Sequence, residues 1–173
     1  MKTILLLTIL TIYASTVFSA DFEIKGLRIG MSESDFKKIN SKAKCEVSPR
    51  DPELRRLLPI RRMCTVPRYT LATKESDDAQ FLFYEDKLGA INLTFRDVNS
   101  EDLKTAFNEK YGNPSGRGST LRPGDTQEWR VGNAELRLAN DNRNTFVFVN
   151  SDISEEWAIK MNKLKAKKLR SDM

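Results

Sequence analysis

A strict alternation of apolar and polar side chains in residues 91–96 constrains the fold more than any other feature of this chain. Ile91, Leu93 and Phe95 are apolar, and the residues between them are polar. Successive side chains of a β-strand point to opposite faces of the sheet, so this strand has one face against a core and one in water. Antiparallel sheets commonly have that arrangement, whereas parallel sheets are buried on both faces. The segment therefore predicts an antiparallel sheet with one wet face.

Other patterns predict strands and helices in a repeating order. Ser32 and Asn99 are good N-cap residues, because their side-chain oxygens accept hydrogen bonds from the free N–H groups of a first helical turn. A short turn through Asp86 and Gly89 is expected to join two strands. Strands are predicted at residues 22–29, 67–73, 81–85, 90–96, 127–131, 134–139 and 145–149, and helices after Ser32, at 51–58, at 100–111 and from Asp152. This order predicts an α+β fold, with helices packed on an antiparallel sheet and a C-terminal helix.

A helix followed by three strands occurs twice, which predicts a tandem repeat of that unit. Three columns match when the helix starts at Ser32 and Asn99 are aligned. The candidate repeat halves are residues 21–97 and 98–173, within a single domain of residues 21–173. Chance is the alternative, since three matched columns are few.

Residues 1–20 predict a secretory signal peptide. Lys2 supplies the charged start, residues 4–12 are apolar, and cleavage is expected after Ser19 or Ala20. An uncleaved membrane anchor is the alternative, but the apolar core is short for a membrane span. We therefore expect an exported protein, either periplasmic or secreted.

Cys45 and Cys64 are the two cysteines of the sequence. In an oxidising compartment an isolated pair most simply forms a disulfide. It would close a loop of about 20 residues and stabilise the fold by roughly 3 kcal/mol on the chain-entropy model. A redox-active pair would need close C-x-x-C spacing, and a zinc site would need more ligands in a chain without histidine. We expect neither a metal nor a cofactor.

Two short motifs carry a resemblance to a known group. The run GLRIGMS from Gly26 to Ser32, followed by an acidic residue and a helix, resembles the opening of small bacterial envelope proteins of the β-lactamase-inhibitor-protein and BamE/SmpA type. The run KYGNP from Lys110 to Pro114, with Trp129 on a later strand, is also similar to them. The resemblance implies a helical pair leading into a short antiparallel sheet, a unit that the inhibitor branch carries twice. The BamE branch is typically lipid-anchored, and no cysteine lies near the predicted cleavage site, so no role in outer-membrane assembly is carried over.

The composition argues against an enzyme. Without histidine the chain lacks the usual general base near neutral pH and the Ser-His and Cys-His systems. Glu75, Asp77 and Asp78 could form a carboxylate site of the glycosidase kind, but a solvated loop is the simpler interpretation. The glycine-rich segment 112–120 follows a helix and lacks the lysine of a phosphate-binding loop.

The arginines between the cysteines are the strongest candidates for a binding site. Residues 50–68 contain six arginines and two acids. An arginine fork binds carboxylates and phosphates in a bidentate manner, and a disulfide would lower the ordering cost of binding. The candidate binding residues are Arg55, Arg56, Arg61 and Arg62. A solvated helix surface is the alternative interpretation.

The functional hypothesis is a non-enzymatic exported binding protein, an inhibitor, immunity or accessory factor. It would act as a monomer on another protein with an acidic surface. The alternative is a peripheral envelope-maintenance factor that touches anionic membrane weakly through its basic C-terminal run, residues 160–172. The simpler interpretation of that run is a frayed helix end whose cations suit the helix dipole. No nucleic-acid partner is expected, because aromatic residues do not interleave with the basic clusters.

Overall fold

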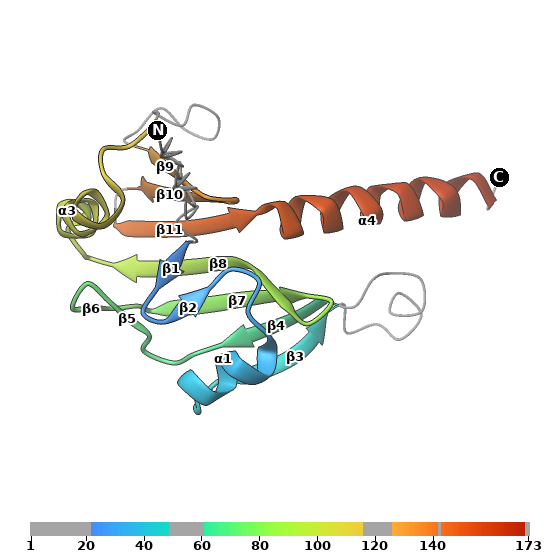
Figure 1. Ribbon diagram of the computed structural model, residues 1–173, viewed down its shortest axis with the longest axis horizontal. Coiled ribbons are helices and arrows are strands. Elements are labelled where there is room, and N and C mark those ends of the chain that lie inside the picture. The colour runs from blue at the N-terminus through green and yellow to red at the C-terminus, as the bar shows by residue number, and fades with distance from the viewer. Residues whose placement is uncertain (1–21, 49–60, 116–125, 142, 172–173) are drawn as a thin grey trace, which may run out of the picture.

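The computed structural model describes residues 22–48, 61–115, 126–141 and 143–171. In this part of the chain, helices pack on a large antiparallel sheet (Figure 1), so the predicted α+β class is confirmed. The helices are α1 (Glu33–Ile39), α3 (Ser100–Tyr111) and α4 (Asp152–Ser171). The strands are β1 (Glu23–Ile24), β2 (Leu27–Arg28), β3 (Lys44–Ser48), β4 (Arg61–Thr65), β5 (Thr70–Leu71), β6 (Lys74–Glu75), β7 (Asp78–Tyr84), β8 (Lys87–Arg96), β9 (Gln127–Val131), β10 (Ala134–Asn140) and β11 (Asn144–Ser151).

The main sheet joins seven of the described strands in the order β3-β4-β7-β8-β11-β10-β9, and each neighbouring pair is antiparallel. Strands β8 and β11 lie side by side in its middle (Figure 1). Each half of the sheet begins at an outer edge and proceeds strand by strand to this central pair. A tandem repeat would produce this layout, although the duplication itself stays a prediction.

One face of the sheet carries continuous rows of buried side chains. The register aligns one such row across six strands, and each member is at most 1% exposed: Cys64, Phe81, Ile91, Val149, Leu136 and Trp129. Burying one large apolar side chain contributes roughly 1.5–3 kcal/mol. These rows, contributed by both halves of the chain, therefore form the centre of the hydrophobic core.

Helices α1 and α3 cover this buried face. Phe36 of α1 packs on Phe81, with ring centroids 4.7 Å apart. Phe107 of α3 meets Trp129 edge to face at 5.5 Å, and the indole N–H donates to the carbonyl of Gly112 at 2.9 Å. Both helices thus lie on one side of the sheet, one over each half.

The predicted helix starts are confirmed. The Ser32 hydroxyl accepts a hydrogen bond from the backbone N–H of Asp35 at 3.1 Å. The Asn99 side chain accepts one from the N–H of Glu101 at 3.0 Å. Each cap satisfies a donor that the first turn leaves free, which explains why both helices begin where the sequence indicates.

Helix α4 continues from β11 and projects beyond the sheet (Figure 1). Near its start, the Trp157 ring packs on Tyr84 at 5.2 Å, and the Arg61 guanidinium lies 5.4 Å from the same indole. Lys160 Nζ lies 3.3 Å from a carboxylate oxygen of Glu85. No helix in the described residues is both long enough and apolar enough to cross a membrane.

Two segments that were predicted to be single strands form short hairpins. Residues 22–29 contain β1 and β2, because positive φ angles at Lys25–Gly26 reverse the chain. The segment 67–73 contributes only β5, which pairs with β6 across a turn at Ala72–Thr73. Both predictions of one continuous strand were wrong: the first placed Gly26 inside a strand although glycine favours a turn, and the second reversal uses residues that give a weak turn signal.

Gly89 does not lie in the predicted turn. The chain reverses at Glu85–Asp86, and Gly89 lies within β8, where the register with β7 shifts between Leu82 and Phe83. A Cβ atom at Gly89 would lie 2.5 Å from the Tyr84 ring and 3.1 Å from Ile153. Glycine is therefore required by the close approach of a ring to the backbone.

The disulfide between Cys45 and Cys64 is confirmed. It joins opposed residues of β3 and β4, two strands that the sequence patterns did not predict. The predicted leader, the predicted helix at 51–58 and most of the glycine-rich segment lie outside the described residues.

We predict that Gly89→Ala lowers the free energy of unfolding by about 1–3 kcal/mol, because the added methyl group overlaps the Tyr84 ring. Urea unfolding measures the change. The control is the same substitution in a Tyr84→Leu background, where the penalty should shrink. An equal penalty in both backgrounds would contradict the steric explanation.

We predict that Thr73→Gly raises the free energy of unfolding by about 1 kcal/mol, because a β-branched residue at positive φ is disfavoured. Thermal unfolding of the variant measures the gain. Thr70→Gly in the neighbouring strand is the control and should destabilise. A loss of stability in Thr73→Gly would show that the threonine side chain has a compensating role.

Candidate binding surface

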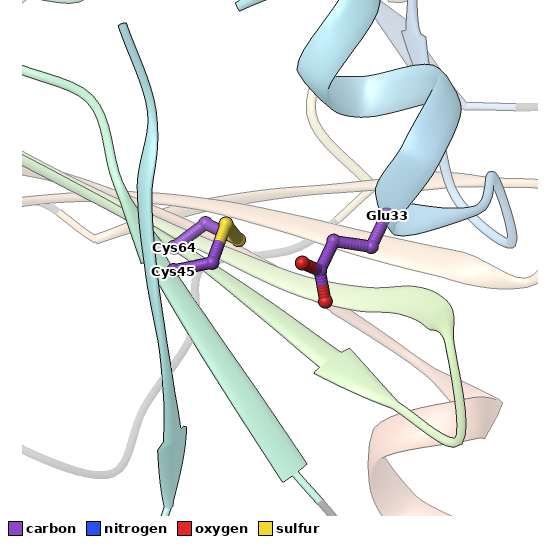
Figure 2. A group of neighbouring side chains, drawn as sticks. All are labelled: Glu33, Cys45 and Cys64. Carbon is purple, nitrogen blue, oxygen red and sulfur yellow. A yellow bond between two sulfur atoms is a disulfide. The ribbon is translucent and has the colours of Figure 1, made fainter.

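The Glu33 carboxylate faces the disulfide of β3 and β4 (Figure 2). One of its oxygens and the sulfurs of Cys45 and Cys64 lie within 4.8 Å of one another, the spacing of a metal site. The sulfurs are bonded to each other, however, so neither offers a thiolate ligand. The carboxylate already binds two cations, Arg62 Nε at 2.6 Å and Lys37 Nζ at 2.6 Å. The arrangement fits an internal ion pair better than a metal centre.

The ion pair of Glu33 and Arg62 fastens α1 to β4. Glu33 lies in the first turn of α1, where a carboxylate suits the positive end of the helix, and its side chain is only 10% exposed. Arg62 shares the inner face of β4 with Cys64, because residues two apart in a strand point the same way. Removal of Arg62 would leave the nearly buried Glu33 carboxylate with Lys37 as its remaining cation. This pair has a structural role.

Two arginines of the predicted binding site, Arg61 and Arg62, lie on opposite faces of the sheet. Arg61 and Arg62 are consecutive in β4, so their side chains point to opposite faces of the sheet. Arg62 contacts Glu33 on the inner face, whereas Arg61 lies against Trp157. Arg55 and Arg56 lie outside the described residues. The structure does not bring Arg61 and Arg62 together, and binding by the four arginines stays a prediction.

The acidic candidates lie on the surface. Glu75, Asp77 and Asp78 are all exposed. Asp77 accepts a hydrogen bond from the backbone N–H of Arg96 at 2.6 Å, and Asp78 accepts one from the Gln80 amide at 2.7 Å. All three side chains are therefore solvated, as the alternative to a carboxylate site expected. The expectation of a loop was wrong for two of them, because Glu75 lies in β6 and Asp78 in β7.

The face of the sheet opposite the core has uncharged side chains at its centre. The register aligns Thr65, Gln80, Asn92 and Phe148 in one row across β4, β7, β8 and β11. The next row pairs Thr94 with Phe146. We call the following six residues the neutral band: Thr65, Gln80, Asn92, Thr94, Phe146 and Phe148. All six are half-buried, because their neighbours in the sheet cover them from the sides only in part.

Two phenylalanines form the apolar part of this band. The rings of Phe146 and Phe148 are stacked, with centroids 5.9 Å apart and planes inclined by 10°. Between and beside them on β11, Thr145, Val147 and Val149 point to the core. Antiparallel sheets usually place polar residues on the wet face, so aromatic residues at these positions are unexpected. They mark the centre of a surface that can bury apolar area.

Charged residues border the band on β9 and β10. Glu128, Arg130, Glu135 and Arg137 lie on adjacent strands, with Arg130 Nη2 3.6 Å from Glu135 and Arg137 Nε 3.8 Å from Glu128. Burial raises the pKa of Glu135 above its ordinary value of 4.5, and the nearby Glu128 raises it further. The positive charges of Arg137 and Arg130 lower the same pKa. The border therefore contains both signs of charge, in contact with each other.

The sequence contained a signal for the neutral band. Residues 145–149 are apolar at four of five positions, so both faces of that strand would be apolar rather than one. The outward positions of this strand, occupied by Phe146 and Phe148, could have been recognised from that excess alone. The side chains that join them from β4, β7 and β8 could not, because the order of the strands was unknown.

Comparison with known proteins gives a family but no activity. A family model described as "Uncharacterised protein" matches residues 24–162. The match extends from β1 into α4 and includes the neutral band. Searches of curated proteins and of solved structures found no match.

We predict that Glu135→Gln reduces the loss of stability that occurs as the pH rises above about 4.5, the ordinary pKa of this carboxyl group. Between the ordinary pKa and the raised pKa of the folded protein, the folded state binds more protons than the unfolded state, so stability falls as pH rises. Urea unfolding across this range should show a steeper fall for the natural protein than for the variant. Glu109→Gln, at an exposed position of α3, is the control. Equal slopes for all three proteins would contradict the prediction.

Proposed function

We propose that this chain, which belongs to the family described as "Uncharacterised protein", is a non-enzymatic exported binding protein that holds another protein against the open face of its sheet. The observation that supports this proposal is the neutral band with its stacked phenylalanines, bordered by charged residues. The absence of histidine from the sequence favours binding over catalysis.

The composition of the open face resembles the core of a protein interface. Such cores contain few charged residues and are enriched in aromatic side chains, and the charged residues lie at the rim. Here the threonines and amides of the band offer hydrogen bonds, and Phe146 and Phe148 offer apolar area. The rim consists of Glu128, Arg130, Glu135 and Arg137. Aromatic residues near the centre of an interface are the usual energetic anchors.

The width of the sheet is close to that of a standard protein interface. Seven strands spaced about 4.8 Å apart span roughly 30 Å. An interface of standard size buries about 800 Å² on each partner, which corresponds to a patch roughly 32 Å across. The first turns of α4 lie on this face beside Arg61 and Tyr84, so a partner would dock on the rest of the face. Because α1 and α3 pack on the opposite face, neither needs to move for a partner to dock. A preformed rigid surface lowers the ordering cost of binding.

The chemistry of the band indicates the kind of partner. A centre without charge favours a partner surface that is apolar and rich in hydroxyl and amide groups, because a charged group would lose its hydration there without gaining a counter-ion. The mixed rim would select the orientation of the partner rather than supply most of the affinity. This differs from the acidic partner that the arginine-rich segment predicts, and both alternatives can be distinguished by one binding experiment.

We predict that Phe148→Glu abolishes capture of the partner protein from envelope extracts, because a buried carboxylate would oppose the neutral centre. The matched control is Ile159→Glu, which introduces the same charge at a 54% exposed apolar residue of α4. Hydrogen exchange of the purified complex should show added protection in β8 and β11. Circular dichroism checks that Phe148→Glu is folded. The proposal is wrong if the folded variant binds the same partner with the same affinity, or if the added protection appears outside β8 and β11.

A further inference from the structure

Helix α4 projects beyond the sheet (Figure 1), and its sequence contains six cations from Lys160 onward, four of which fall on one side of the helix. Lys160, Lys163, Lys167 and Arg170 follow the spacing i, i+3, i+7 and i+10, which places them on one side of a helix. All four are exposed. We call these four residues the basic stripe. At 1.5 Å per residue it is about 15 Å long.

The helix itself does not explain the stripe. The helix dipole favours cations only in the last turn, and Lys160 and Lys163 lie two to three turns before Ser171. Glu156 lies four residues before Lys160, but no acid occurs in the sequence from Trp157 to Ser171, so α4 offers Lys163, Lys167 and Arg170 no acidic partner three or four residues away. Cations three and four residues apart repel each other and weaken an isolated helix. The described counter-ion is Glu85, which lies beside Lys160 at the near end of the stripe.

We propose that the basic stripe is a peripheral contact site for an anionic lipid surface. A linear row of cations on a projecting helix can approach a flat array of negative headgroups along its whole length, and the array would relieve the repulsion within the stripe. Each Lys or Arg near such a surface contributes favourably, and the contribution decays within a Debye length. The contact is electrostatic, because the exposed apolar residues Ile159 and Leu164 lie on different sides of the helix and cannot insert together.

The residue types favour lipid over an acidic protein. Three of the four residues are lysine, a hydrated point charge, rather than the arginine fork that recognises carboxylates in a fixed geometry. The stripe has no aromatic or apolar anchor at its centre, which a protein interface of useful affinity requires. This proposal is independent of the neutral band, since the two surfaces use different elements and different forces.

The test measures sedimentation of the purified protein, without its predicted leader, with vesicles of phosphatidylcholine containing 30% phosphatidylglycerol. The natural protein should bind these vesicles at low salt and dissociate from them at 0.5 M salt. It should not bind vesicles of phosphatidylcholine alone. The variant Lys163→Gln/Lys167→Gln/Arg170→Gln should bind about a hundredfold more weakly, since each charge contributes about fivefold. Circular dichroism confirms that the variant keeps its helices.

A control variant separates the stripe from net charge. Lys42→Gln/Lys44→Gln/Arg143→Gln removes the same charge from exposed positions away from α4 and should bind as the natural protein does. Equal loss in both triple variants would attribute binding to net charge and overturn the site. Absence of binding by the natural protein would also overturn it. Retention on immobilised polyglutamate without vesicle binding would assign the stripe to an acidic protein instead.

Discussion

The antiparallel pairing of β8 with β11 is the interaction on which both faces of the sheet depend. It opposes Ile91 to Val149 on the buried face and Asn92 to Phe148 on the open face. Because side chains alternate along a strand, a slip of one residue would exchange the two faces and expose the apolar rows. The free-energy penalty of exposing those rows therefore fixes the register of β8 and β11. The same register brings the residues of the neutral band together on the other face. The core and the candidate binding surface are two consequences of one pairing.

Charged groups serve three different purposes in this protein. Glu33 and Arg62 form an internal pair that fastens α1 to the disulfide-linked strands, so they are engaged within the fold. The charges on β9 and β10 compensate one another and would orient a partner. Beyond Lys160, the basic stripe has no such compensation along its own helix, because no acid follows Glu156 in α4. Binding at the neutral band should depend weakly on salt, whereas binding at the stripe should depend on it strongly.

Prediction from the sequence succeeded where the deciding signal is local. The caps at Ser32 and Asn99 act within three residues, and α3 has the predicted bounds of Ser100–Tyr111. Prediction failed where a distant contact decides. The turn at Ala72–Thr73 contains neither glycine nor asparagine, so its positive φ angles carry no local signal. Strands β3 and β4 were missed because their pairing, rather than a long apolar pattern, makes them strands.

The sequence by itself determined the fold class, the cysteine pairing and the alternation that gives the sheet one wet face. These follow from side-chain period, capping chemistry and composition, which act over a few residues. Only the tertiary structure decided which wet-face residues become neighbours. Thr65 and Phe148 share one row because four strands from distant parts of the chain pair in a particular order. That order is set by the joint burial of apolar rows and the pairing of backbone groups between strands, and neither can be evaluated one segment at a time.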